Sequence, residues 1–502
     1  MSGIPKGWVL TNAIEISDSV RGVSYKKEQA KFTPDDNFTA VLRANNIQGN
    51  RIFLDDLVYV QNSNINPTQF LKINDIVIAM SSGSLSVVGK SAQVKEGMQA
   101  SFGAFCGVLR PTSVIEPRYL GLFLKSDIYR KSISNLARGS NINNLKWSHF
   151  EEIPLPLAPL PEQKRIADKL DSVLARVDAC RERLARVQPL LKRFRQSVLA
   201  AATSGRLTED WRAERAPDYK SGAPVTVGDL ADQAANDQRA STLSATSAAG
   251  IEPASVSSNL TDYASNIQWL ETDVQSVATV GTGSTPLRSN ATFYATTGMP
   301  WITSSATGDD FVTVASEFVT EDAIKTHRLK VYPIGTLLVA MYGEGKTRGQ
   351  VSELAIEATI NQACSAVVVD EKKANRAFVK LALQANYFVM RELAEGGNQP
   401  NLNLSKIKEF RLHLPSLLEQ HEIVRRVETL FAFADRLEAR LAAAQGAADK
   451  LTPALLAKAF RGELVPQDPN DEPAAELLKR LAAQRAAAPK PKRGRKAASA
   501  GD

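Results

Sequence analysis

The sequence is poor in several features, and each shortage excludes a class of protein. Three cysteines among 502 residues cannot build a disulfide framework, which indicates a reducing compartment. No apolar run reaches the ~18 residues that a membrane-spanning helix needs. The first residues, MSGIPKGWVL, lack the charged and apolar regions of a signal peptide. We therefore expect a cytoplasmic protein that does not contact a membrane.

Sequence motifs for catalysis and metal binding are also scarce. The four histidines are scattered without metal-ligand spacing, so we expect surface or structural roles for them: His149, His327, His413 and His421. Gly83–Ser91 places five residues between its glycines instead of the four of a phosphate-binding loop, and Gly343–Thr347 lacks the earlier glycine. The adenine-methylating signature, an Asn or Asp before two prolines and an aromatic residue, is missing. We expect no catalytic residue, metal or cofactor in this chain.

The charge of the chain is mildly positive. Lysine and arginine exceed aspartate and glutamate by 61 to 54, a net charge of +7, and the isoelectric point is about 9.1. Residues 1–150 hold 17 basic against 11 acidic residues, a difference of +6. This balance favours a polyanionic partner but does not identify one.

A long heptad pattern follows Pro161. Apolar residues recur at alternating steps of four and three over about five heptads, which predicts a helix that packs against another helix. These positions are Ile166, Leu170, Val173, Val177, Cys180, Leu184, Val187, Leu191, Phe194 and Val198.

The same pattern occurs again 257 residues later. Its positions are Ile423, Val427, Leu430, Ala434, Leu437, Leu441, Ala444, Ala448, Leu451 and Leu455. The repeat extends from Gly139 and Gly396 to Gly205 and Gly462, which we expect to terminate the two helices. Pro189 is expected to break or kink the first helix, and its repeat partner Gly446 is also a weak helix former.

A globular unit precedes each heptad segment. In the first unit, residues 51–54, 57–60, 75–80 and 102–109 predict strands, and residues 119–136 predict a helix. Trp8 and Gly22 recur in the second unit as Trp269 and Gly283, again fourteen residues apart. The fold class is therefore α+β. Two similar β-rich units are separated by two long helices, which pack as an intramolecular antiparallel coiled coil with pseudo-two-fold symmetry.

Composition sets the expected boundaries. A Ser- and Ala-rich linker separates the two repeats, with a short helix near 227–239. A last helix near 474–488 precedes a basic tail, 489–496. The predicted segments are the first globular unit, 1–152; the first helical region, 153–207; the linker, 208–262; the second globular unit, 263–409; the second helical region, 410–465; and the tail, 466–502.

Antiparallel helices suggest a spacing device. Parallel packing would place both units at one end, where they would compete for space. The stretch from 162 to 188 is about 40 Å long at 1.5 Å per residue. Two readers on one face of B-DNA need centres roughly 34–36 Å apart. Many coiled coils have this length, so a plain dimerisation stalk remains an equal alternative.

Both units contain polar loops whose residue types could bind DNA. Arginine and lysine bind guanine or phosphate, asparagine and glutamine pair with adenine, and serine and threonine bind phosphate. Solvated turns are the competing interpretation for each single residue. The candidate DNA-binding residues are Arg21, Tyr25, Lys26, Lys27, Arg43, Asn45, Asn46, Ser82, Ser84, Lys90, Asn141, Asn143, Thr282, Ser284, Thr303, Ser304, Tyr342, Lys346, Arg348, Asn361, Gln362 and Asn398.

Short motifs at the helix starts and ends carry a family resemblance. Leu160–Ile166 and Leu417–Ile423 share the pattern Leu-x-Glu-Gln-x-x-Ile, and the ends share Gly-x-Leu at Gly205 and Gly462. With Gly283-x-Thr-Pro286 and Pro300–Thr303, the chain resembles the specificity (S) subunit of type I restriction-modification systems. Its first half is similar to the enterobacterial K family, type IA, in residues 21–27, 42–47 and 78–84.

The resemblance implies a non-catalytic DNA-recognition subunit. Each unit would read one half of a bipartite, asymmetric target in double-stranded DNA, and the coiled coil would set the spacer. Two methyltransferase subunits carrying S-adenosylmethionine would dock on the helices, and two ATP-driven, Mg-dependent motor-nuclease subunits would complete the complex. A fused DNA-modifying enzyme and a coiled-coil scaffold without DNA affinity remain as alternatives.

Overall fold

The computed structural model describes residues 4–137, 143–215, 269–343, 346–394 and 401–487. The chain divides into two compact units, residues 1–186 with 441–502, and residues 187–440. Each unit contains part of both long helices, α4 (Leu160–Thr203) and α14 (Leu417–Phe460).

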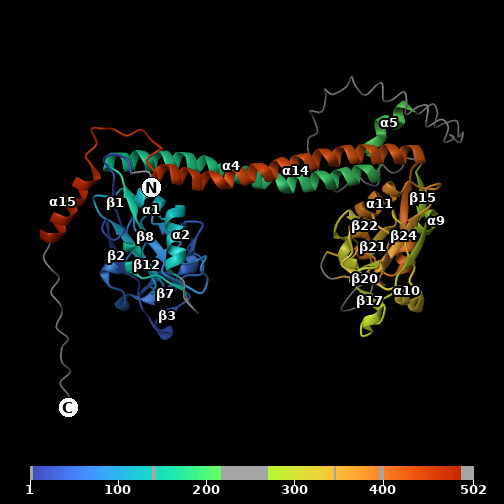
Figure 1. Ribbon diagram of the computed structural model, residues 1–502, viewed down its shortest axis with the longest axis horizontal. Helices are drawn as coiled ribbons and strands as arrows, with labels where there is room; N and C mark the ends of the chain where they lie inside the picture. The colour runs from blue at the N-terminus through green and yellow to red at the C-terminus, as the bar shows by residue number, and fades with distance from the viewer. Residues whose placement is uncertain (1–3, 138–142, 216–268, 344–345, 395–400, 488–502) are drawn as a thin grey trace, which may run out of the picture. The chain divides into compact units, whose positions relative to one another are not determined.

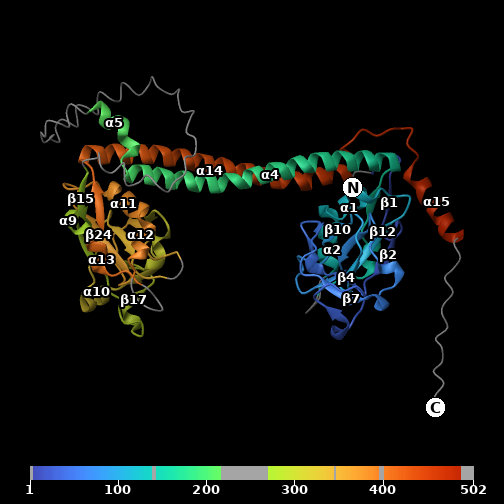
Figure 2. The same ribbon diagram turned by 180° about the vertical axis from the view of Figure 1, so that it is seen from behind.

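The first unit is built on two four-stranded sheets, which Figures 1 and 2 show from opposite sides. One has the order β10-β8-β12-β2 and is antiparallel: β10 (Ser91–Gln93), β8 (Ile76–Ala79), β12 (Cys106–Pro111) and β2 (Ser17–Arg21). The other has the order β11-β4-β7-β3: β11 (Ala100–Phe102), β4 (Phe38–Leu42), β7 (Val58–Gln61) and β3 (Ala30–Lys31). Three strand pairs complete the unit: β1 (Val9–Thr11) with β14 (Leu155–Leu157), β5 (Ile47–Gln48) with β6 (Arg51–Ile52), and β9 (Ser81–Ser82) with β13 (Asn143–Asn144).

The second unit repeats the order of both four-stranded sheets. Its first sheet runs β22 (Val351–Leu354), β21 (Leu337–Ala340), β24 (Cys364–Val369) and β16 (Ala278–Thr282), with β19 (Phe311–Val312) added beside β22. Its second sheet runs β23 (Thr359–Ile360), β18 (Met299–Ile302), β20 (Glu317–Val319) and β17 (Tyr294–Ala295). The pair β15 (Leu270–Asp273) with β25 (Arg411–Leu414) corresponds to β1 with β14.

Both units also contain short helices. The first unit has α1 (Pro117–Phe123), α2 (Asp127–Leu136) and α3 (Trp147–Glu151). The second has α9 (Val274–Val277), α10 (Glu321–His327), α11 (Arg376–Ala385), α12 (Tyr387–Glu392) and α13 (Leu404–Lys408). Because the two units share the order of their sheets, the predicted α+β class with two similar β-rich units is confirmed.

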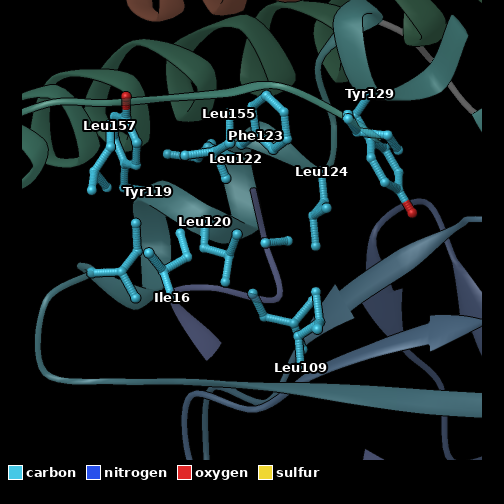
Figure 3. Close-up of a cluster of buried hydrophobic side chains, with 14 of the residues drawn as sticks. Ile16, Leu109, Tyr119, Leu120, Leu122, Phe123, Leu124, Tyr129, Leu155 and Leu157 are labelled. Atoms are coloured by element: carbon cyan, nitrogen blue, oxygen red, sulfur yellow. The ribbon is translucent and has the colours of Figure 1, made fainter. Parts of the chain in front are cut away.

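The main core of the first unit joins its sheets to both long helices. Figure 3 shows side chains of α1 gathered beside Leu155 and Leu157 of β14. The same core contains Ile166 of α4 and Phe460 of α14. The Phe460 ring meets the ring of Tyr119 edge-on, with centroids 5.2 Å apart, an arrangement worth about 0.5–1.5 kcal/mol beyond area burial. The end of α14 is therefore part of the first unit, although it lies some 300 residues further along the chain.

The two long helices are antiparallel in each unit. In the first unit, the start of α4 shares its core with the end of α14. In the second, Val198 and Ala202 near the end of α4 share a core with Ile423 and Val427 near the start of α14. The predicted antiparallel coiled coil is confirmed.

Most predicted seam positions lie buried or half-buried, but three do not. Cys180 and Ala444 are exposed, and Leu451 is 47% exposed. Val173, Leu184, Val187, Phe194, Leu430, Leu437 and Leu455 are half-buried. The fully buried seam positions are Ile166, Leu170, Val177, Leu191, Val198, Ile423, Val427, Ala434, Leu441 and Ala448.

Both helices run through their weak positions. α4 continues past Pro189, and α14 continues past Gly446 and Pro453. Of the predicted break or kink at Pro189, the break is wrong, because a proline removes only one N–H donor and packing on both sides holds the remaining turns, while the kink stays a prediction. Gly205 and Gly462 follow the helix ends with φ of +77° and +74°, which confirms them as terminators.

Three predicted elements of the first unit are divided or shortened. Residues 102–109 form the end of β11, a turn and the start of β12, because Cys106 N–H donates to Gly103 O at 2.8 Å. Residues 119–136 form α1 and α2, since Ser126 caps the second helix. Within 51–54, the strand β6 covers Arg51–Ile52 only.

The segment after Gly205 is folded. A short 3-10 turn, Arg206–Thr208, leads into α5 (Glu209–Glu214), which lies against the start of α14. The remainder of the predicted linker lies outside the described residues, as do the helix near 227–239 and the basic tail. The predicted last helix is confirmed as α15 (Ala474–Ala487), and its Leu477 and Leu481 pack into the first unit.

Candidate nucleic-acid interface

One turn organises the polar loops of the first unit. The turn Gly103–Cys106 joins β11 to β12 and is closed by the Cys106 N–H bond to Gly103 O. The carbonyl of Phe105 accepts from the N–H of Met80 at 2.8 Å and from that of Ser81 at 3.2 Å. These bonds bring the ends of β8 and β11 together.

The second unit contains the same turn at Asn361–Cys364. Cys364 N–H donates to Asn361 O at 3.2 Å, and the carbonyl of Ala363 accepts from the N–H of Met341 at 2.8 Å. Gly103 N–H donates to Leu42 O in the first unit, and Asn361 N–H donates to Ile302 O in the second, both at 2.9 Å. We call this set of backbone bonds the turn frame.

A glycine in each unit allows the chain directly after β2, or directly after β16, to approach the turn frame closely. Val23 N–H donates to Phe102 O at 2.8 Å, and Ser284 N–H donates to Ile360 O at 3.2 Å. A Cβ on Gly22 would lie 2.1 Å from Gly103 O, and one on Gly283 would lie 1.6 Å from Ile360 O. No side chain fits such distances, which explains the glycine fourteen residues after each tryptophan.

The turn frame gathers three predicted loops of the first unit around a cavity of about 460 Å³. The loops are residues 21–27, 43–46 and 81–84. Tyr25, Arg43 and Asn45 line the cavity, together with Ser81 and Phe105.

The predicted residues of the first unit differ in exposure. Exposed ones are Arg21, Lys26, Lys27, Asn45 and Ser84, and half-buried ones are Tyr25, Arg43, Ser82 and Lys90. Asn141 and the side chain of Asn143 lie outside the described residues. Lys90 belongs to the turn before β10, where its carbonyl accepts from Ala79 N–H.

Asn46, one of the predicted DNA-binding residues, is buried inside its own loop. Its side chain is buried, accepts from Arg43 N–H at 2.8 Å, and donates to Phe53 O and Asp55 O at 3.0 and 2.7 Å. These bonds hold the loop, so the amide of Asn46 serves the fold of its own loop and is not presented at the surface. Sequence reasoning could not separate Asn46 from exposed Asn45, because adjacent asparagines look alike without a backbone.

Asp56 ties two predicted readers to the protein. Its carboxylate accepts from Arg43 at 2.6 Å and from the amide of Asn45 at 3.1 Å. Arg43 also donates to the Asp56 carbonyl at 2.6 Å. The guanidinium is thus oriented before any ligand arrives. Sequence reasoning missed Asp56, which has a left-handed backbone with φ of +52°.

The equivalent place in the second unit is more polar. Thr285 donates to the side-chain oxygen of Gln362, and the hydroxyls of Thr303 and Ser305 lie 2.8 Å apart. Thr282 donates to Cys364 O at 2.9 Å. Exposed predicted residues are Thr282, Tyr342, Lys346 and Gln362, and half-buried ones are Ser284, Thr303, Ser304, Arg348 and Asn361.

Lys346 and Arg348 belong to a different loop from the turn frame. Their carbonyls accept from Tyr387 at 2.7 Å and from Arg391 at 3.0 Å, both on α12. Asn398 lies outside the described residues. A separate cavity of about 400 Å³, lined by α12, α13 and β25 residues, contains none of the predicted readers.

The turn frame buries a cysteine in each unit. Burial raises the pKa of Cys106 and of Cys364 to about 12, so both thiols stay protonated at neutral pH. Neither supplies the thiolate that nucleophilic chemistry needs.

The two turn frames share a sequence pattern at 102–106 and 360–364: a buried apolar residue, three loop residues and a cysteine. This pattern is the sequence signal that could have located the frame.

The Glu-Gln motif anchors each long helix to its unit. Gln163 accepts from Glu116 N–H at 2.8 Å and donates to Ala158 O at 2.8 Å. Gln420 repeats this with Asn375 N–H at 2.7 Å and Pro415 O at 2.8 Å. Both amides sit at the N-terminus of a helix, α1 or α11, so the motif fixes the helix base against the fold.

The described residues contain neither a metal-binding cluster nor a membrane-spanning helix. No group of three or more histidine, cysteine, aspartate or glutamate side chains there could hold a metal ion. No helix in the described ranges is long and apolar enough to span a bilayer.

The chain matches a known family over most of its length. The model for the "Type I restriction modification DNA specificity domain" matches residues 5–188 and 266–444. The chain is 33% identical to the StySPI specificity subunit of Salmonella potsdam over 99% of both chains, and 34% identical to the EcoKI specificity subunit of Escherichia coli K12 over 98% of both.

Solved structures agree on the fold. A chain from a study of complex assembly and conformational transition of the type I R-M system superposes with a TM-score of 0.66 at 16% identity, covering 92% of this chain and all of that one. The HsdS subunit of Thermoanaerobacter tengcongensis gives a TM-score of 0.55 at 16% identity, with 92% and 98% covered. The chain belongs to the family of type I restriction-modification specificity subunits, and its high-coverage relatives are of the type IA kind.

Proposed function

We propose that this chain is the non-catalytic DNA-recognition subunit of a type I restriction-modification complex. Each unit reads one half of a bipartite, asymmetric target. The observation that carries the proposal is the turn frame, which both units build with the same backbone bonds but furnish with different side chains. One backbone design with two sets of reading groups suits two unlike half-sites.

The catalytic work belongs to partner subunits in this proposal. Two methyltransferase subunits supply S-adenosylmethionine and methylate adenine, and two motor-nuclease subunits use ATP and Mg²⁺. The protonated thiols of Cys106 and Cys364 support a passive role for the turn frame. The printed names of the relatives, specificity subunits of type I restriction enzymes, support the same assignment.

The long helices set the spacer and receive the methyltransferase subunits. Arg181 contacts Asp449 in the first unit, and Arg195 contacts Asp435 in the second. The steps between these pairs are 14 residues on each helix, two heptads in opposite directions. Deleting one heptad from each helix between the two pairs preserves this register. It should shorten the recognised spacer by about three base pairs, since seven residues rise about 10 Å and one base pair about 3.4 Å.

A unit exchange tests the core of the proposal. The chain is reconstituted with the methyltransferase subunits of its host, and methylated adenines are mapped on random bipartite DNA. Replacing residues 269–410 with the matching segment of the Salmonella potsdam subunit should change one half of the target and leave the other half unchanged. An unaltered target contradicts the proposal.

The same reconstitution separates the two alternative functions. Methyl transfer or DNA cleavage by the lone chain would indicate a fused DNA-modifying enzyme. Equal binding of all sequences by the full complex would indicate a scaffold.

A further inference from the structure

Phe105 is an aromatic residue that the turn frame does not need. Its carbonyl accepts two frame bonds, but its side chain is 67% exposed at the tip of the turn. In the second unit the same backbone position holds Ala363, and the frame closes in the same way. The phenyl ring is therefore free to serve a ligand.

The surroundings of Phe105 indicate what that ligand is. The ring lies on the lining of the 460 Å³ cavity with half-buried Tyr25, and burial raises the pKa of the Tyr25 phenol, so it stays neutral. Three exposed basic residues, Arg21, Lys26 and Lys27, belong to the same loop as Tyr25, although they do not line the cavity themselves. An apolar hollow beside cationic loops fits a ligand with a phosphate backbone and an apolar group on its edge.

DNA has one such apolar group in its major groove, the 5-methyl group of thymine. We propose that Phe105 is a specificity-determining residue of the first unit, and that with Tyr25 it contacts the 5-methyl group of a thymine in that unit's half of the target. This rests on the proposed function. The second unit has Ala363 with hydrogen-bonding Gln362 and Thr285 at the corresponding place, and reads there by polar contacts.

The test removes the methyl group from the DNA. Duplexes carrying the mapped target are made with each thymine of the first unit's half-site replaced by uracil, and binding to the reconstituted methyltransferase complex is measured. One replacement should weaken binding by the unaltered protein about fourfold, the value of one buried methyl group. Phe105→Ala should lose most of the preference for thymine over uracil, because only Tyr25 then remains beside the methyl group, whereas Phe105→Leu should keep the preference.

Matched controls fix the location of the effect. Phe32 is 72% exposed in the same unit but does not line the cavity, so Phe32→Ala should retain the preference. When uracil replaces thymine in the second unit's half-site, the change in binding should be the same for Phe105→Ala as for the unaltered protein.

The outcomes are distinguishable. If the unaltered complex selects no sequence, the proposed function fails. If it selects a target but no uracil replacement weakens binding, or Phe105→Ala keeps the thymine preference, the role of Phe105 is overturned while the function stands. A rise in 2-aminopurine fluorescence beside the sensitive position that is lost in Phe105→Ala would show a base inserted into the cavity, and would also overturn the methyl contact. The uracil series uses the unaltered protein, so a poorly folding variant does not block the test.

Discussion

The indole N–H of Trp8 donates a 2.9 Å hydrogen bond to the carboxylate of Glu162, 154 residues further along the chain. The second unit repeats the bond between Trp269 and Glu419 at 3.2 Å. The two glutamates are buried at equivalent helix starts, yet their surroundings differ. Glu419 also accepts from Arg212 and Thr208, while one oxygen of Glu162 has no hydrogen-bond partner in the described part of the chain. The glutamate of the Glu-Gln motif is therefore paired with an arginine in the second unit, and in the first unit it has a tryptophan as its hydrogen-bond partner.

Removing the cation beside Glu419 should destabilise the second unit. Arg212→Met leaves a buried carboxylate without its guanidinium, and breaking such a pair costs about 3–5 kcal/mol. Urea unfolding of the purified chain measures the loss. Arg206→Ala is the matched control, because Arg206 is exposed six residues earlier and should change stability by less than about 0.5 kcal/mol. Equal effects of the two variants would contradict the assigned role of Arg212.

Glu162 should make the first unit more stable at lower pH. Burial raises its pKa above the ordinary value of 4.5, although the Trp8 bond and Arg165 act in the opposite direction. The folded state then holds the proton more tightly than the unfolded state, so stability rises as pH falls toward 4.5. Glu162→Gln keeps an acceptor for Trp8 and removes this dependence.

The measurement for Glu162 is a difference between two pH profiles. Unfolding free energies of the parent and of Glu162→Gln are compared from pH 4 to pH 8. The advantage of the variant should be largest near neutral pH and should vanish at or below about pH 4.5. A parent that gains stability over the variant as pH rises would reverse the sign and refute the argument.

The two glycines beside the turn frames should be irreplaceable. A Cβ on Gly283 or Gly22 would overlap a carbonyl oxygen, so alanine there must push a strand away from the frame. We expect Gly283→Ala to destabilise the second unit by about 1–3 kcal/mol and to abolish selection of its half-site. Gly308→Ala is the control, since a Cβ there meets nothing within 4 Å. Melting temperature and target mapping give the two readouts.

The sequence predicts those parts of the structure that leave a repeating pattern, and it does not predict the parts that depend on contacts between distant residues. The heptads and their 257-residue offset fix the long helices and the unit count, because periodicity over five heptads is strong. The sequence did not predict the turn frame, because the frame depends on backbone hydrogen bonds between strands that are far apart in the chain, such as Val23 to Phe102. Such bonds produce no repeating pattern in the sequence. Asn46 shows the same limit: its residue type suits a base contact, but its burial serves the loop. Pro189 shows that packing overrides local propensity in a helix with a partner along its length.

Thiol labelling should distinguish one cysteine from the other two. Cys180 is exposed on α4, while Cys106 and Cys364 are buried with pKa values of about 12. The folded chain at pH 8 should react with one equivalent of a thiol reagent, and peptide mass spectrometry should place the label on Cys180. Unfolding in urea should release the other two. Early labelling of Cys106 or Cys364 would mean that the turn frame opens readily.

A charge on the helix seam should have an effect that follows burial rather than heptad position. Ile166 and Cys180 both occupy predicted seam positions, but Ile166 is fully buried and Cys180 is exposed. Ile166→Asp combines the loss of a buried aliphatic side chain with an unpaired charge, so we expect a cost of about 5 kcal/mol or more. Cys180→Asp should cost less than about 0.5 kcal/mol. Half-buried Leu184→Asp should fall between them and still weaken the helix pair. Circular dichroism melts and capture of the methyltransferase subunits measure the series. Three equal losses would mean that the pattern alone, and not the packing, determines which positions the helices bury.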